Sequence, residues 1–227
     1  MKIGGLHKCS YIDYPGNMSA VVFAQGCPLR CPYCHNPELL SEGVEGRVTE
    51  DAVWDFLKTR VRKLDAVVVT GGEPCMQPDL MTFLEKIKKL GFLIKLDSNG
   101  YYPKILKAIL DAKLVDYVAM DVKAPLDKYQ EITRSDVLPE NIAQSIQSIK
   151  TSGIDCEFRT TVVRSQLSEA DLLEISKLVA GHRYFLQKFV PTKPLDKRFL
   201  NESTYSDSEF AALCEQLKTI VPLCDVR

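Results

Sequence analysis

The chain has 227 residues, of which 45% are hydrophobic and 26% charged, as in an ordinary globular protein with one large core. A net charge of −1 gives no electrostatic reason to bind nucleic acid or a membrane surface, and no apolar run reaches the length of a membrane span. Because the first residues contain no apolar leader, the chain is expected to be cytoplasmic, where clustered cysteines more often bind metals or react than form disulfides.

Short apolar runs alternate with amphipathic segments along the chain. The runs that predict β-strands are SAVVFAQ (19–25), AVVVTGGEP (66–74), FLIKLDSNG (92–100), YVAMDVKAP (117–125), CEFRTTVVR (156–164) and RYFLQKFV (183–190). A helix is expected after each run: from about Thr49, over 78–90, near Pro103, around Ile142 to Ile149, from SEAD (168–171) and from SDSE (206–209). The apolar residues of 78–90 recur at helical spacing, and SEAD resembles a capping box.

Six strands that alternate with helices predict a parallel sheet with right-handed crossovers. Because a full eight-unit barrel typically needs about 250 residues, the expected fold is α/β, a partial (β/α)6 barrel with parallel strands, in a single domain over residues 1–227. An open doubly wound sheet is the structural alternative. The polar stretch 191–209 is expected to be a loop, either a surface connection or a lid.

Three cysteines stand close together in FAQGCPLRCPYCHNPEL (23–39). Cys27, Cys31 and Cys34 form the pattern C-x3-C-x2-C, which provides three thiolates and no obvious fourth. A 4Fe-4S cluster suits this number, because three thiolates hold it while the fourth iron binds a ligand from outside the protein. The pattern therefore predicts one cluster with an open position.

A structural zinc ion is the alternative interpretation of this triplet. His35 or Cys75 would then be the fourth ligand, although zinc ligands usually come as two spaced pairs. The cysteines outside the triplet are scattered, and each of them, Cys9 included, is expected to be a buried small apolar side chain.

Polar groups follow the next three predicted strands where each strand ends. GGEP (71–74), DSNG (97–100) and DVK (121–123) are separated by about the length of one strand, one helix and two loops. The carboxyl ends of parallel strands in a β/α barrel build the active site. We therefore expect these three motifs and the cysteine loop to lie on one rim.

Together these motifs resemble those of radical S-adenosylmethionine (SAM) enzymes. C-x3-C-x2-C with Tyr33 before its last cysteine is similar to the cluster signature of that superfamily, and GGEP resembles its second motif. DYPG (13–16), QGCPLRCPYCHNPEL (25–39), DSNG and DVK together resemble activating enzymes of glycyl radical enzymes. The greatest resemblance is to the anaerobic ribonucleoside-triphosphate reductase activating protein group, followed by the pyruvate formate-lyase activating enzyme.

The resemblance implies a cofactor set. Cys27, Cys31 and Cys34 would ligate three irons of a single 4Fe-4S cluster, and the fourth iron would bind the amino and carboxylate groups of SAM. Reduction of the cluster by a low-potential electron donor would then release a 5′-deoxyadenosyl radical. The implied partner is a glycyl radical enzyme, most closely an anaerobic ribonucleotide reductase.

The resemblance also implies roles for the other motif residues. Gly71 and Gly72 would let the backbone approach the methionine moiety, Glu73 would stabilise the loop or accept from the amino group, and Tyr33 would pack near the adenine. The residues implied around the charged groups of SAM are Asp97, Ser98, Asn99, Asp121, Lys123 and Arg159.

A monovalent cation beside the SAM carboxylate is implied as well. In the pyruvate formate-lyase relative, residues matching Asp97, Ser98 and Asp121 help to form this cation site. Loop or capping carboxylates, and a strand-edge salt bridge for Arg159, are the alternative interpretations of these charged residues. The relative's last-strand histidine has no counterpart, because only Gln187 and Lys188 stand there.

Three functions stay open from the sequence. The first is activation of a glycyl radical enzyme, of the ribonucleotide reductase or the pyruvate formate-lyase type. The second is a radical SAM reaction on a small molecule, as in a carboxy-deazaguanine synthase-like enzyme. The third is a zinc-containing binding module without catalysis. The short chain favours the first, since it leaves little sequence for a small-molecule lid.

Overall fold

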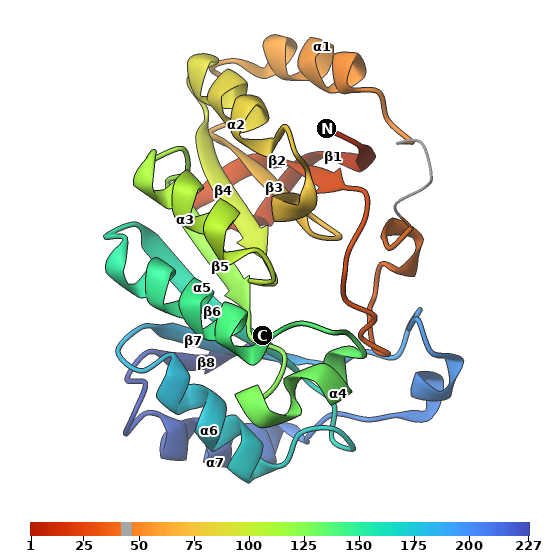
Figure 1. The fold of residues 1–227 in the computed structure, drawn as a ribbon, viewed down its shortest axis with the longest axis vertical. Coiled ribbons are helices and arrows are strands. Elements are labelled where there is room, and N and C mark those ends of the chain that lie inside the picture. The colour runs from red at the N-terminus through yellow and green to blue at the C-terminus, as the bar shows by residue number, and fades with distance from the viewer. Residues whose placement is uncertain (42–46) are drawn as a thin grey trace.

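The computed structural model describes residues 1–41 and 47–227, which are built around one eight-stranded sheet (Figure 1). The strands lie side by side in chain order: β1 (Ile3–Tyr14), β2 (Asn17–Ala24), β3 (Ala66–Gly71), β4 (Leu93–Ser98), β5 (Tyr117–Asp121), β6 (Asp155–Val162), β7 (Arg183–Lys188) and β8 (Cys224–Val226). All neighbouring pairs from β2 to β8 are parallel, and β1 is antiparallel to β2. A doubly wound sheet reverses its strand order, so this sequential order confirms the partial barrel.

The helices connect the parallel strands and gather on one side of the sheet (Figure 1). They are α1 (Glu50–Arg60), α2 (Leu80–Lys89), α3 (Pro103–Asp111), α4 (Tyr129–Thr133), α5 (Pro139–Thr151), α6 (Glu169–Leu178) and α7 (Asp207–Leu217). Ser168 and Ser206 begin α6 and α7 with complete capping boxes, as the sequence indicated for SEAD. In the described part of the chain, no helix combines the length and apolar character that a membrane crossing requires.

Three features of the structure differ from the sequence predictions. β1 and β8 were not expected: β1 has only Ile3, Ser10 and Tyr14 fully buried, without clear alternation, and β8 is three residues long. The short α4 was not expected either. The prediction that every scattered cysteine is buried is wrong for Cys9, which is exposed on the edge strand β1.

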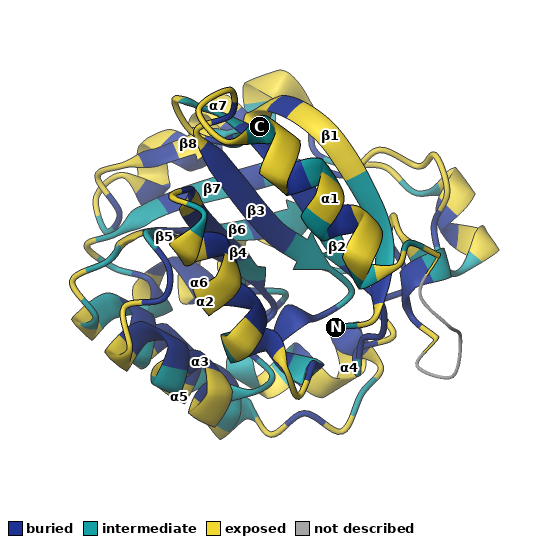
Figure 2. Ribbon diagram, turned by 90° about the horizontal axis from the view of Figure 1, so that it is seen from above, coloured by how far each residue is buried: buried dark blue, intermediate teal, exposed yellow. Residues whose placement is uncertain are grey.

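The two faces of the sheet differ in character. The outer face packs against the helices and forms the large apolar core, with the strands buried at the centre of the molecule (Figure 2). The inner face has a small apolar cluster that includes Val21, Val68 and Tyr117. Because side chains alternate along a strand, the residues two and four positions beyond Tyr117 share this inner face, and one of them is Asp121. The inner face thus becomes polar toward the carboxyl ends of the strands.

Candidate functional site

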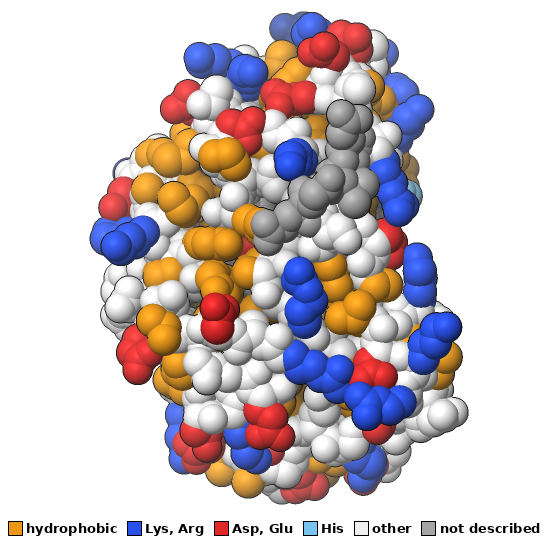
Figure 3. All heavy atoms as spheres, turned by 45° about the vertical axis from the view of Figure 1, so that its right-hand side comes forward, with side chains coloured by type: hydrophobic (Ala, Val, Ile, Leu, Met, Phe, Trp, Pro, Cys, Tyr) orange, Lys and Arg blue, Asp and Glu red, His pale blue; other side chains and the backbone are white. Residues whose placement is uncertain are grey.

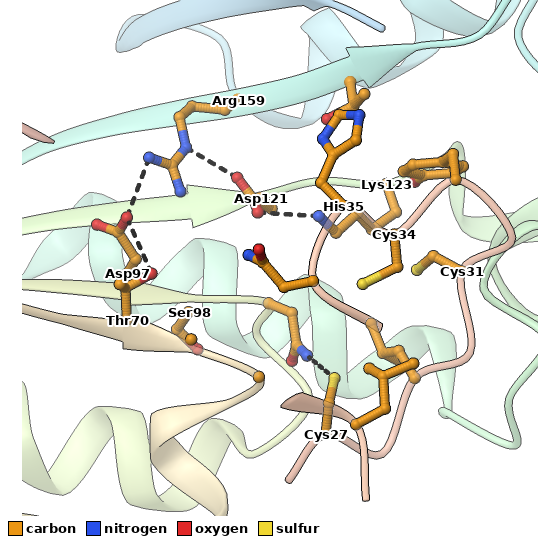
Figure 4. Close-up of a pocket in the computed structure, with 18 of the residues that line it drawn as sticks. Cys27, Cys31, Cys34, His35, Thr70, Asp97, Ser98, Asp121, Lys123 and Arg159 are labelled. Atoms are coloured by element: carbon orange, nitrogen blue, oxygen red, sulfur yellow. Dashed lines mark hydrogen bonds and ion pairs between the residues drawn. The ribbon is translucent and has the colours of Figure 1, made fainter. Parts of the chain in front are cut away.

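A cavity of about 210 Å³ lies at the carboxyl ends of the parallel strands. It is bounded by the cysteine loop after β2 and by the ends of β3 to β7 (Figure 4). All the predicted site residues except Glu73 line it: Cys27, Cys31, Tyr33, Cys34, Gly71, Gly72, Asp97, Ser98, Asn99, Asp121, Lys123 and Arg159. The structure therefore brings together motifs that are far apart in the sequence.

The three cysteines of the loop face this cavity from one side (Figure 4). Cys27 and Cys31 are buried and Cys34 is half-buried. Burial raises the pKa of Cys27 to about 12 and that of Cys31 to about 11. Metal ligation requires the thiolate form, so a bound metal must displace these protons.

Hydrogen bonds connect the segment 191–209, and Val190 just before it, to the cysteine loop. The backbone N–H of Asp196 donates to the Pro32 carbonyl at 2.9 Å, and the His35 ring nitrogen lies 3.0 Å from the Val190 carbonyl oxygen. In Figure 1 the two segments meet at the lower right of the molecule. Of the two roles expected for this segment, these contacts favour a surface connection that braces the cysteine loop.

The two glycines of GGEP allow a close approach between chain segments. A Cβ on Gly71, whose φ is +121°, would lie 2.4 Å from the Ala24 nitrogen, and a Cβ on Gly72 would lie 2.1 Å from the Gly26 carbonyl oxygen. The N–H groups of Gly72 and Glu73 donate to the carbonyls of Ala24 and Gly26 at 3.0 and 2.8 Å. GGEP thereby fixes the entry to the cysteine loop. The predicted approach of these glycines to the methionine moiety stays a prediction.

Glu73 is fully buried, with 0% of its surface exposed, and it does not line the cavity. Its Oε1 accepts from Cys75 N and Ser98 Oγ, both at 2.9 Å, and its Oε2 accepts from Asn99 N at 2.6 Å. Burial raises the pKa of Glu73 against the opposing effect of these donors. The contacts assign Glu73 to bracing the loops after β3 and β4, which was one of its two predicted roles.

Replacing Glu73 with Gln should lower the free energy of unfolding of the metal-free protein by about 1–3 kcal/mol. A glutamine side chain has one acceptor oxygen, so at least one buried backbone N–H loses its partner. Chemical unfolding of the variant measures this change. Glu85→Gln is the control, because Glu85 is exposed on α2, and equal stability of the two variants would contradict the bracing role.

Arg159 and two carboxylates form the wall of the cavity opposite the thiols, and Lys123 reaches this wall from beside Cys34 (Figure 4). Arg159 bridges the carboxylates: its Nε lies 2.8 Å from Asp121 Oδ1 and its NH1 lies 3.2 Å from Asp97 Oδ2. Lys123 Nζ lies 2.9 Å from Asp121 Oδ2. Burial alone would raise the pKa of Asp121, but Arg159 and Lys123 outweigh it and hold that pKa well below its usual range. Arg159 thus forms ion pairs in this structure, and its contact with SAM stays a prediction.

Sequence reasoning missed several polar residues at this site. Thr70 donates to Asp97 Oδ2 at 3.4 Å, and Lys95 Nζ lies 2.6 Å from Asp97 Oδ1. Of the two residues that the sequence offered at the last strand, Gln187 lines the cavity, whereas Lys188 Nζ lies 2.6 Å from an Asp207 carboxylate oxygen outside it. The alternation of β4 was the available signal, because it places Lys95 and Asp97 on the same face of that strand.

The residues of the cavity fit a cluster with SAM beside it. Three thiols and two cationic groups that could bind a carboxylate line the same cavity. The Tyr33 hydroxyl, which also borders the cavity, is buried without a hydrogen-bond partner among the described residues. An incoming ligand could satisfy this hydroxyl, whose orphaned state otherwise costs free energy.

The zinc alternative finds less support in the local contacts. Cys75 is buried beside Ser98, with 3.7 Å between sulfur and hydroxyl oxygen, and does not line the cavity. His35 stacks on Phe189 with ring centroids 5.5 Å apart and turns a ring nitrogen to a carbonyl. Within residues 1–41 and 47–227, no three His, Cys, Asp or Glu side chains converge on a single-ion site. The cysteine ligands of a 4Fe-4S cluster bind different irons, so they stand further apart than the ligands of a single metal ion.

Comparisons with known proteins agree with this geometry. Residues 21–179 match the family model of the radical SAM superfamily. A Methanocaldococcus jannaschii protein, provisionally named a glycyl-radical enzyme activating enzyme, is 36% identical over 205 residues, which are 87% of this chain and 83% of that protein. The pyruvate formate-lyase-activating enzyme of Clostridium pasteurianum is 34% identical over 128 residues, 51% of this chain and 53% of that protein.

Solved structures extend the likeness at the level of the fold. Streptococcus suis SuiB, solved bound to S-adenosylmethionine, aligns with a TM-score of 0.70 at 15% identity, over 91% of this chain and 49% of that chain. Archaeal TYW1 aligns with a TM-score of 0.60 at 15% identity, over 89% of this chain and 72% of that chain. The sequence matches, and the three cysteines at the mouth of a parallel barrel, show that this chain belongs to the radical SAM superfamily and is an enzyme that uses a 4Fe-4S cluster and S-adenosylmethionine.

Proposed function

We propose that this chain generates a glycyl radical on a partner enzyme, and that the partner is an anaerobic ribonucleoside-triphosphate reductase. The observation that carries the proposal is the 36% identity, over most of both chains, to a protein provisionally named a glycyl-radical enzyme activating enzyme. The resemblance through DYPG and QGCPLRCPYCHNPEL favours the ribonucleotide reductase as partner. The proposal includes an external low-potential electron donor.

Cys27, Cys31 and Cys34 hold the cluster in this proposal. When bound, the cluster and SAM supply a carbon-centred radical that removes a hydrogen atom from carbon. Asn99 donates its side-chain N–H toward Cys27 sulfur at 3.5 Å, which stabilises negative charge on that ligand. The braced loop keeps the three sulfurs in position before the reaction begins.

SAM lies between the thiols and the charged wall. Lys123 and Arg159 bind its carboxylate, because they are the cationic groups that border the cavity. Gly71 and Gly72 form the edge next to the methionine moiety, and Tyr33 packs against the adenine. These residues would hold SAM in one orientation beside the cluster, which would supply the electron for its cleavage.

The partner's glycine loop enters over the rim near 191–209. This segment exposes Lys193 at 65% and Arg198 at 80%, which pair with Glu38 and Asp196, and the apolar Leu200 at 47%. Figure 3, which turns the right-hand side of Figure 1 forward, has Lys and Arg side chains gathered on the lower half of this face with apolar side chains among them. Such a surface suits an acidic or mixed docking segment.

The experiment mixes reduced, cluster-loaded protein with SAM and the candidate reductase in the absence of oxygen. The expected result is a doublet electron paramagnetic resonance signal of a glycyl radical, with about one 5′-deoxyadenosine formed per radical. A reductase with its radical-site glycine changed to alanine is the matched control and should give no doublet.

A small-molecule reaction is the second candidate. A 7-carboxy-7-deazaguanine synthase from Thermococcus kodakarensis is 26% identical over 73% of this chain and 72% of that protein. Sustained turnover of a small molecule, with no radical on any partner, would favour this candidate over the activase.

A further inference from the structure

The motif resemblance implies a monovalent cation beside the SAM carboxylate. Its expected ligands, Asp97, Ser98 and Asp121, do not fit a free cation in this structure. The Ser98 hydroxyl donates to Glu73 at 2.9 Å and accepts from Gly100 N at 3.1 Å, on the side of the buried carboxylate. Ser98 is thus committed to bracing the loop.

The oxygens of the two carboxylates are also engaged. Asp97 Oδ1 faces Lys95 Nζ at 2.6 Å, and Asp97 Oδ2 faces Arg159 NH1 at 3.2 Å. Asp121 Oδ1 and Oδ2 face Arg159 Nε at 2.8 Å and Lys123 Nζ at 2.9 Å. Every carboxylate oxygen therefore has a positive partner from the chain itself.

Lys95 is the unusual member of this group. Its side chain is 2% exposed, although it has a charged end. It extends along the inner face of β4, and its ammonium also lies 5.9 Å from the centre of the Tyr117 ring. A buried lysine is rare unless it is paired, and here Asp97 is the pairing carboxylate.

The charges do not cancel within the wall. With Glu157 and Arg227, which continue the network from Arg159, Lys95, Lys123, Arg159 and Arg227 contribute four positive charges against the three of Asp97, Asp121 and Glu157. Lys123 and Arg159 line the cavity, whereas Lys95 does not. The surplus positive charge is therefore presented to the cavity by the two outer cations, where it suits the carboxylate of SAM.

We propose that the Lys95 ammonium, in place of a free monovalent cation, neutralises Asp97 at the back of the wall, so that SAM binds to this chain independently of potassium or sodium. The proposal rests on the SAM site of the proposed function. Lys95 acts as a positioning residue. It neutralises Asp97 from the side away from the cavity, and this leaves Arg159 and Lys123 available to the SAM carboxylate. A covalently attached ammonium costs no binding of an ion from solution.

The first test measures the dissociation constant of SAM for the cluster-loaded protein by equilibrium dialysis. Potassium, sodium and choline chlorides are compared at one ionic strength. The dissociation constant of the wild type should differ by less than about twofold among the three salts. Lys95→Met should bind SAM more weakly in choline, and potassium or sodium should tighten its binding about tenfold, which is an ordinary size for coupling between two binding sites. Lys104→Met on the exposed surface of α3 is the matched control and should follow the wild type.

The second test uses metal-free protein without SAM, and its readout is the thermal midpoint of unfolding. Potassium should raise the midpoint of Lys95→Met relative to choline, because the ion enters beside the unpaired Asp97 carboxylate. It should have no such effect on the wild type or on the double variant Lys95→Met/Asp97→Asn, in which both charges of the pair are removed.

The outcomes separate this inference from the proposed function. A wild-type protein that binds SAM only with potassium or sodium would overturn the built-in cation and leave the SAM site intact. The built-in cation would also be overturned if potassium and sodium changed neither the SAM dissociation constant nor the thermal midpoint of unfolding of Lys95→Met. Failure of the wild type to bind SAM in every salt would instead overturn the proposed function. If Lys95→Met does not fold, the comparison of wild-type SAM binding in potassium, sodium and choline tests the built-in cation by itself.

Discussion

Serine in place of Cys27, Cys31 or Cys34 is expected to abolish cluster binding. The anaerobically reconstituted wild type should hold about four irons and four sulfides per chain, and each variant close to none, because two thiolates do not retain a cube with an open iron. Cleavage of SAM should fall to background in all three variants. Iron and sulfide analysis, together with the electron paramagnetic resonance signal of the reduced protein, measures the effect.

Cys9→Ser is the matched control for these variants. Cys9 is exposed on β1 and does not line the cavity, so its replacement should leave iron content and SAM cleavage unchanged. Stoichiometric zinc without iron in the anaerobic wild type would contradict the cluster. Full iron content in any of the three cavity-facing serine variants would contradict the ligand assignment.

Gly72→Ala is expected to damage both stability and cluster binding. The new Cβ would lie 2.1 Å from the carbonyl oxygen of Gly26, which is backbone and immediately precedes Cys27. To relieve this clash, the backbone must move at Gly26, where the chain enters the cysteine loop. We expect the free energy of unfolding of the metal-free protein to fall by about 3 kcal/mol, at the upper end for overpacking, and reconstituted iron to fall with it.

Gly5→Ala controls for the general cost of adding a methyl group. Its Cβ would meet the Phe23 side chain at 3.6 Å, an ordinary van der Waals distance. This variant should unfold within about 0.5 kcal/mol of the wild type. A Gly72→Ala protein that is as stable and as rich in iron as Gly5→Ala would contradict the close approach.

Much of the fold could be predicted because its signals are local. The β-branched run that ends at Gly71 and the helical spacing of Leu80, Phe83 and Leu84 each report a single element, and both elements form as expected. β1 has no such signal, since its position at the sheet edge leaves both of its faces partly exposed. Tertiary pairing with β2 creates this strand, and no local pattern reports that pairing.

The candidate site divides in the same way. The position of the cysteine loop and of Asp97, Asp121 and Arg159 on one rim follows from the order of strands and loops. The direction of each side chain does not, because Glu73 turns into the protein and accepts a hydrogen bond from Ser98 there. The pairing of a lysine with the aspartate two residues later on β4 was readable from alternation, but its burial depends on how the barrel curves.

Transfer of a labelled hydrogen tests the central claim most directly. A candidate reductase is prepared with deuterium on the α-carbon of its glycines and mixed with the reduced, cluster-loaded chain and SAM without oxygen. If the chain takes the hydrogen atom from that glycine, the 5′-deoxyadenosine recovered should carry one deuterium, in about equal amount to the glycyl radical formed. Unlabelled 5′-deoxyadenosine in the presence of the labelled partner, with no glycyl radical, would contradict the activase.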